Sequence, residues 1–344
     1  MTRNKINISI LIAIIFLGIL LFFLNLFVGT VTIPFADLFK VFFGEETNST
    51  ISTIVFDYRL PQAVTALFAG ASLSVAGLLM QTLFRNPLAD PSMLGISSGA
   101  GLGVAITILF TGILGGSALS SFGLWSNIGV SIAAFLGATL VLMLILGFSS
   151  RVRNMTTLII IGLMVSYLAG SLTDIMKFFS MKEDIHAFVI WGMGSFSAVG
   201  KTKLAFFSIS IILGLFASLF MSKNLNIMLL GDLYAENLGL NVKRNNLFVI
   251  LVSGYLTAIV TAYCGPLGFV GIISPHIARW ILKTASHKDL IIGTTIIGAC
   301  ISLGADLIIQ LSSIPLPVGS VMAIIGTPLV LAIMSKGGLS LARK

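Results

Sequence analysis

The chain has 344 residues, of which 57% are hydrophobic and only 9% are charged. Soluble domains carry about 25% charged residues, because a surface that faces water must be largely polar. This composition excludes a soluble globular domain and predicts an all-α, polytopic membrane protein whose surface is covered by lipid.

Ten apolar runs approach the length of about 20 residues that crosses the hydrocarbon core of a bilayer. The first is 23 residues long, whereas the apolar core of a signal peptide has about 7–15, so we expect it to remain as a span. The eighth is short and contains Pro275 and His276. We predict one transmembrane domain over 1–344, with spans at 6–28, 62–84, 93–114, 127–148, 155–177, 204–221, 247–264, 268–282, 290–311 and 318–334.

Basic residues set the predicted orientation. When the N-terminus is placed in the cytoplasm and the spans alternate, fourteen of the twenty Lys and Arg residues lie on the cytoplasmic side. Cytoplasmic loops of membrane proteins carry such an excess, so both termini are predicted to be cytoplasmic. The net charge of +8 includes no basic cluster with interleaved aromatic residues, and no nucleic-acid partner is expected.

A segment with two prolines joins the second and third predicted spans. It covers 85–91 and is followed by many small residues at 95–103. Two prolines four residues apart prevent a continuous helix, and irregular backbone at membrane depth persists only against protein or a water-filled cavity. Two interpretations stay open: a gate at the inner mouth of a pathway, or an ordinary cytoplasmic turn.

Two further segments bear on ATP. The segment 194–202 looks like a phosphate loop, but five residues separate its glycines and the motif requires four. ATP is therefore not expected to bind this chain. The longest predicted inner segment, 222–246, contains a short surface helix at 231–239, in which Leu230, Tyr234 and Leu238 recur at the spacing of one helical face.

Isolated polar residues in the later spans are candidates for chemistry. His276 has no second metal ligand nearby in the sequence, so we interpret it as a polar residue at a helix end and predict no metal site. Asp306 is the only acid deep in an apolar run and could bind a coupling ion, as in an ion-coupled secondary transporter. We favour a structural link between helices, because one acid is too few for an ion relay. No arrangement of catalytic side chains is visible, so no enzyme and no bound cofactor are expected.

A short internal similarity relates 59–100 to 244–278. Each stretch contains a glycine, a span, a Pro-Leu pair and a Gly-Ile pair. Two inverted repeats of five spans each would account for it, and inverted repeats are frequent in transporters.

Taken together, these motifs resemble the FecCD-type permease family of bacterial ABC importers, whose members carry iron–siderophores, haem or cobalamin. The resemblance runs from the first span to the C-terminus. The residues that carry it are 59–61, 70–73, 77–81, 86–91, 94–100, 231–239, 265–271, 275–279 and 317–319.

The resemblance implies a fold like that of the cobalamin-importer permease, in a bacterial cytoplasmic (inner) membrane. It implies four kinds of partner: a cytoplasmic ABC ATPase dimer that binds ATP and Mg²⁺, an extracytoplasmic substrate-binding protein, a second permease subunit, identical or paralogous, and the lipid bilayer. This chain would then be the permease subunit that translocates the iron chelate or cobalamin.

The resemblance also implies roles for particular residues. The gate would comprise Asn86, Pro87, Leu88, Asp90 and Pro91, together with Arg151 and Asn154 of a second loop. The helix that contacts the ATPase would comprise Gly231, Asp232, Tyr234, Ala235, Glu236, Leu238 and Gly239. Docking of the binding protein would involve Arg59, and also Gln62 and Gln310, where some members carry arginine. Because these two positions lack the positive charge, Lys182, Lys201 or Lys203 could supply it instead.

Overall fold

The computed structural model describes residues 8–29, 33–34, 40, 49–110, 124–152, 155–312, 314 and 316–341, and every element in these ranges is helical. The first half contains α1 (Ile8–Phe27), α3 (Ser49–Thr53), a π-helical turn (Ile54–Arg59), α4 (Leu60–Phe84), a 3₁₀ turn (Pro91–Leu94), α5 (Ile96–Ala105) with a π-helical end (Ile106–Phe110), α8 (Leu124–Ser149) and α9 (Met155–Phe179). The second half contains α10 (Lys182–Met193), α11 (Gly200–Phe220), α12 (Ser222–Met228), α13 (Asp232–Asn237), α14 (Val242–Cys264), α15 (Val270–Leu282), α16 (His287–Leu311) and α17 (Val318–Leu341).

All ten predicted spans coincide with helices. Seven helices among the described residues are long and apolar enough to cross a membrane, and three shorter apolar helices match the third, eighth and tenth predicted spans. The second span is longer than predicted, because α3 and the π-helical turn continue into α4 and make one helix over Thr50–Phe84. α10 lies between the fifth and sixth spans and was not predicted.

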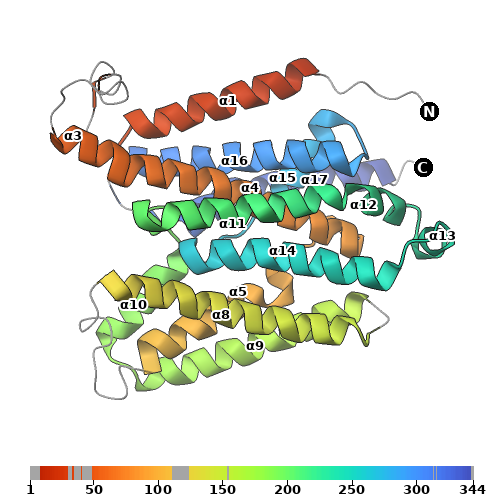
Figure 1. The fold of residues 1–344 in the computed structure, drawn as a ribbon, viewed down its shortest axis with the longest axis horizontal. Coiled ribbons are helices and arrows are strands. Elements are labelled where there is room, and N and C mark those ends of the chain that lie inside the picture. The colour runs from red at the N-terminus through yellow and green to blue at the C-terminus, as the bar shows by residue number, and fades with distance from the viewer. Residues whose placement is uncertain are drawn as a thin grey trace.

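The helices run side by side along the long axis of the molecule (Figure 1). The start of α1, the end of α17 and the small helix α13 lie at the same end, whereas α3 and α10 lie at the opposite end (Figure 1).

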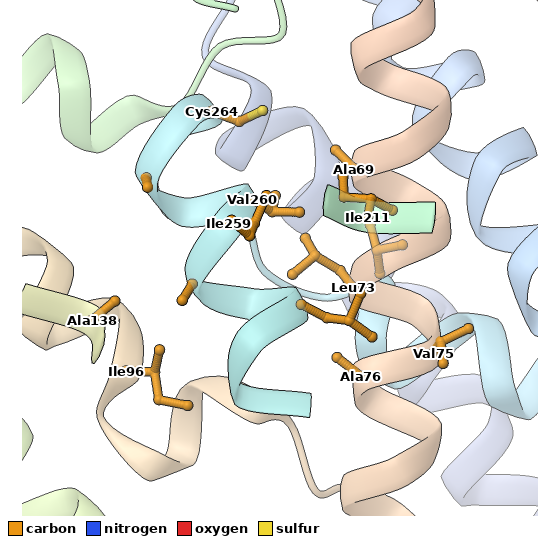
Figure 2. Packing of buried hydrophobic residues seen from close by; sticks show 14 of the residues in the cluster. Ala69, Leu73, Val75, Ala76, Ile96, Ala138, Ile211, Ile259, Val260 and Cys264 are labelled. Atoms are coloured by element: carbon orange, nitrogen blue, oxygen red, sulfur yellow. The ribbon is translucent and has the colours of Figure 1, made fainter. Parts of the chain in front are cut away.

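α4 and α14 cross at the centre of the molecule and form the core. The Ser72 hydroxyl donates to the Leu256 carbonyl and the Ser253 hydroxyl donates to the Ala76 carbonyl, both at 3.1 Å. Figure 2 shows the apolar side chains of α4 (Leu73) and α14 (Val260), with Ile211 of α11 beside them. A serine in an apolar helix can bind a backbone carbonyl of its neighbour, and such bonds join helices in membranes.

The helices that pack against α4 and α14 come from opposite halves of the chain. α4 packs against α15 and α16, while α14 packs against α5 and α8. In each half the central helix is followed by a short helix and a long one, α5 and α8 after α4, and α15 and α16 after α14. α4 ends at Arg85, whose side chain reaches Asp232 just before α14 begins, so the two related helices run in opposite directions. Each of the two helices packs onto helices of the other half of the chain, and the inverted repeat stays a prediction.

Candidate functional site

The loop after α4 is held in shape by its own backbone and side chains. Arg85 adopts a left-handed conformation (φ 48°) and ends α4, and the Asn86 amide donates to the Gln81 carbonyl at 3.2 Å. The Asn86 side chain accepts from the Leu88 amide at 3.0 Å. The Asp90 side chain accepts from the Ser92 amide at 2.8 Å and caps the 3₁₀ turn. Asparagine and aspartate favour such turns because their short side chains bind nearby backbone amides.

Burial gives Asp90 an unusual setting for a loop carboxylate. The side chain lies against Gly271 at the start of α15. Desolvation by burial raises the pKa of the Asp90 carboxyl, and the hydrogen bonds from Ser92 oppose this rise. The loop therefore packs against the start of α15 at Asp90, the residue before its second proline.

α15 also contacts the loop at Pro87 and the last turn of α4 at Gln81. The His276 ring donates from Nε2 to the Pro87 carbonyl at 2.9 Å. The Gln81 side chain donates to the Ile272 carbonyl at 3.2 Å and accepts from Arg279 at 2.6 Å. Among the described residues, no group of three His, Cys, Asp or Glu side chains could hold a metal ion. His276 thus supports the 86–91 loop. From the sequence, His276 was interpreted only as a polar residue at a helix end.

The second predicted gate loop is described only in part. Arg151 is exposed, and its amide donates to the Phe148 carbonyl at 2.9 Å. Asn154 lies outside the described residues. α9 begins directly afterwards and contacts the turn Pro91–Leu94, where Gly95 comes so close that an added Cβ would lie 2.8 Å from the Gly162 carbonyl oxygen.

α13 is shorter than the predicted helix 231–239 and is bounded by glycines. Gly231 (φ 97°) and Gly239 (φ 85°) both adopt left-handed conformations that favour glycine. The two residues thus set the ends of the helix at 232 and 237. Glu236 is exposed and its carbonyl accepts from the Gly239 amide at 2.9 Å.

One face of α13 is buried and the other presents large apolar side chains to solvent. Ala235 is fully buried, whereas Leu233, Tyr234 and Leu238 are 78%, 69% and 62% exposed. Leu230 just before the helix is also exposed. Apolar residues gathered on one exposed helix face are typical of a surface that inserts into a groove of a partner protein.

A salt bridge links α13 to the end of α4. The Arg85 guanidinium contacts the Asp232 carboxylate, and both side chains are about half exposed. Arg85 directly precedes the 86–91 loop. The helix with the exposed apolar face and the proline loop are therefore connected through one residue.

The three residues predicted to dock a binding protein point into the bundle. Arg59 is buried, and its Nη1 donates to the carbonyls of Leu26 and Phe27 at 2.8 and 2.9 Å. Gln62 and Gln310 donate to the two oxygens of Asp306, at 2.7 and 2.9 Å. The docking role of all three stays a prediction, and the structure gives each an internal bond to α1 or α16.

Sequence reasoning missed Asn25, which completes the cluster around Asp306. It is fully buried, accepts from Gln310 at 3.1 Å and donates to the Leu303 carbonyl at 3.0 Å. A single asparagine in an apolar run was the available signal, because a polar side chain facing lipid is costly. The structural interpretation of Asp306 as a link between helices agrees with these contacts.

The fold and this site define a class: a multi-pass membrane transport permease. A model of the FecCD transport family matches residues 15–336, so the chain belongs to this family.

Known relatives and one solved structure agree with this assignment. The hemin transport system permease protein HmuU of Yersinia pestis is 32% identical over 84% of this chain and 85% of its own length. The vitamin B12 import system permease protein BtuC of Klebsiella pneumoniae is 32% identical over 83% of each chain. A structure described as an inward-facing conformation of a metal-chelate type ABC transporter superposes with TM-score 0.83 and 29% identity, over 95% of this chain and 99% of the other.

Proposed function

We propose that this chain is the transmembrane permease subunit of an ABC importer that carries an iron chelate, a siderophore complex or haem, across the cytoplasmic (inner) membrane of a bacterium. The observation that carries the proposal is the exposed apolar face of α13, joined by Arg85 to the 86–91 loop. Family membership and the hemin relative support the cargo, and cobalamin is the other candidate because a vitamin B12 permease is equally similar.

In this proposal the chain performs no chemistry. A separate ATPase dimer hydrolyses ATP with Mg²⁺, and its groove receives Leu233, Tyr234 and Leu238 of α13. An external binding protein delivers the chelate to a pathway between this chain and a second permease subunit. Movement of α13 pulls the 86–91 loop through Arg85, and rigid helices rock to open the pathway. The loop residues Asn86, Pro87 and Leu88, with Asp90 and Pro91, form the inner gate.

The test is uptake in cells that lack the chain, with radiolabelled iron–siderophore, haem and cobalamin compared. Loss of one uptake, restored by the intact chain, identifies the cargo. A Leu238→Asp chain should reach the membrane in normal amount but transport at less than about a tenth of the normal rate, because a carboxylate cannot enter an apolar groove without a large desolvation penalty.

Asn237→Asp is the matched control, because it adds the same charge to an exposed position of the same helix. It should leave uptake within about twofold of normal, since exposed substitutions have small effects. Normal uptake by the Leu238→Asp chain would contradict the proposed role of α13. Unchanged uptake when the ATPase is inactivated would favour an ion-coupled secondary transporter instead.

A further inference from the structure

A cavity of about 480 Å³ lies where α4, α15 and α16 meet, at the same end of the molecule as α13. Its lining includes Gln81, Arg85, Arg279, Lys283, Thr284 and His287. This volume is within the range of roughly 300–1,000 Å³ typical of small-molecule sites. The transport proposal assigns no role to this cavity.

The cavity is strongly basic. Arg85 from α4 converges with Arg279 and Lys283 from α15, and the lining includes no acidic residue. Asp232 offsets the charge of Arg85. Within the described part of the chain, Arg279 and Lys283 form no salt bridge, and the Arg279 guanidinium donates to the neutral side chain of Gln81. Arg279 is partly buried, and a charged group that is partly withdrawn from water is normally paired with an opposite charge. The exposed Lys283 adds a second positive charge to the lining, so the cavity is suited to an anion.

The remaining polar groups favour an anion with several acceptor oxygens. Thr284 brings a hydroxyl group to the lining, and Arg279 keeps further N–H groups beyond the one that binds Gln81. His287 is already engaged with Thr82 at 3.0 Å and Asn226 at 2.9 Å. Attraction to the negative C-terminal end of α15 accounts for Arg279 and Lys283 on that helix, but not for their convergence with Arg85 of another helix.

The position of the cavity, at the ends of apolar helices, indicates where the anion would come from. The cavity lies at the end of α4, the end of α15 and the start of α16. α4 and α16 are long and apolar enough to cross a membrane, and α15 is a shorter apolar helix. Trp280 follows Arg279 directly and is 77% exposed. Exposed tryptophans of membrane proteins gather at the level of the lipid headgroups, and basic pockets between spans at this level bind lipid phosphates.

We propose that this cavity binds the phosphate of an anionic phospholipid, with Arg279 and Lys283 as its main contacts. Arg85 lies between the phosphate and Asp232, so the bound headgroup is connected to α13 through the same side chain. The inference concerns the chain alone and holds whatever the cargo is.

The experiment is native mass spectrometry of the delipidated, full-length protein in detergent, titrated with phosphatidylglycerol or phosphatidylcholine. A parallel thermal-shift titration uses inorganic phosphate. We expect one phosphatidylglycerol to bind more tightly than phosphatidylcholine. In R279Q/K283Q this affinity should fall roughly tenfold or more, since each basic residue near anionic lipid contributes substantially. K288Q, which removes an exposed lysine outside the cavity, should bind as the unmodified chain does.

Three outcomes would overturn the proposal. Equal binding of phosphatidylglycerol by R279Q/K283Q and the unmodified chain would show that the cavity is not its site. Stabilisation by inorganic phosphate without selectivity for the anionic lipid would assign the cavity to a free phosphate. Unchanged lipid binding with weakened association of the ATPase would assign it to that protein. If the double variant does not fold, the single variant K283Q replaces it, because Lys283 is exposed. K283Q should bind phosphatidylglycerol several-fold more weakly than the unmodified chain does.

Discussion

At the scale of single residues, glycines decide how closely the central helices approach. A Cβ added to Gly77 of α4 would overlap with the carbonyl oxygen of Gly271 in α15. A Cβ added to Gly70 would overlap with the Gly298 carbonyl and the Ser302 side chain of α16. Small residues permit close helix packing in membranes, where water does not drive helices together.

Gly77→Ala should therefore destabilise the protein by about 1–3 kcal/mol, since the methyl group meets rigid backbone rather than a flexible side chain. The measurement is thermal unfolding of the purified protein in detergent. Gly170→Ala is the matched control, because Gly170 lies in the middle of α9 with no atom within 4 Å of the added methyl. An unfolding temperature equal in the two variants would contradict the importance of this contact.

Substitutions of the single residue Asp306 test the alternative that the protein is an ion-coupled transporter. Asp306→Asn should preserve uptake, because a rotated Gln62 or Gln310 amide can still pair with the new amide. Asp306→Leu should lower stability by about 1–3 kcal/mol or more, because two buried amides lose their acceptor. Both are checked by uptake normalised to the amount of folded protein. Loss of uptake in a well-folded Asp306→Asn protein would favour a charged, ion-binding role.

At the scale of elements, the salt bridge between Arg85 and Asp232 connects α13 to the end of α4. The bridge is half exposed, so it should contribute at most about 1 kcal/mol to stability. Its role in transport should be larger. Asp232→Arg should reduce uptake several-fold while the protein remains folded, because two like charges then separate α13 from the loop.

The double variant Arg85→Asp with Asp232→Arg restores opposite charges in exchanged positions. It should recover much of the lost uptake, and the ATPase rate of the reconstituted complex should become coupled to transport again. A double variant as impaired as the sum of the two single variants would show that the pair does not act as a unit.

Most elements could be predicted from the sequence, because apolar length is a strong signal in a membrane protein. A helix lies at each of the ten predicted spans, and the ends of α4 and α14 at 84 and 264 agree with the predicted ends of the second and seventh spans. α10 was missed because its sequence starts with Lys182, Glu183 and Asp184 and is too short and polar to resemble a span.

The site was predicted less completely than the elements. The glycines that bound α13 and its exposed face followed from local sequence. Gln62 bonds to Asp306 across 244 positions of the chain, and Gln310 bonds to Asn25 across 285. Local patterns carry no information on such pairs, so the hydrogen bonds of these glutamines could not be predicted from the sequence.

At the scale of the whole molecule, the shared end of α1, α17 and α13 makes the orientation testable (Figure 1). Single cysteines at Lys182 and Lys243 are predicted to lie on opposite sides of the membrane, and both positions are exposed. An impermeant maleimide should label Lys182→Cys in intact spheroplasts, and Lys243→Cys only after permeabilisation.

Background labelling in this experiment should be low, because the native Cys264 and Cys300 are both buried. Labelling of Lys243→Cys in intact cells would reverse the orientation and place α13 outside, where no cytoplasmic ATPase could reach it. Equal labelling of both positions before permeabilisation would contradict the prediction that the chain crosses the membrane an odd number of times between them.

The interlocked halves also constrain how the protein is made. The glycines and serines of α4 contact α14, α15 and α16, and the first of these helices, α14, begins 158 residues after α4 ends at Phe84. At roughly 5–20 residues per second, the glycine and serine face of α4 would wait about 10–30 s during synthesis before its partners arrive. For that interval this face meets lipid, an insertase or a chaperone, and α4 reaches its final neighbours only when translation is nearly complete.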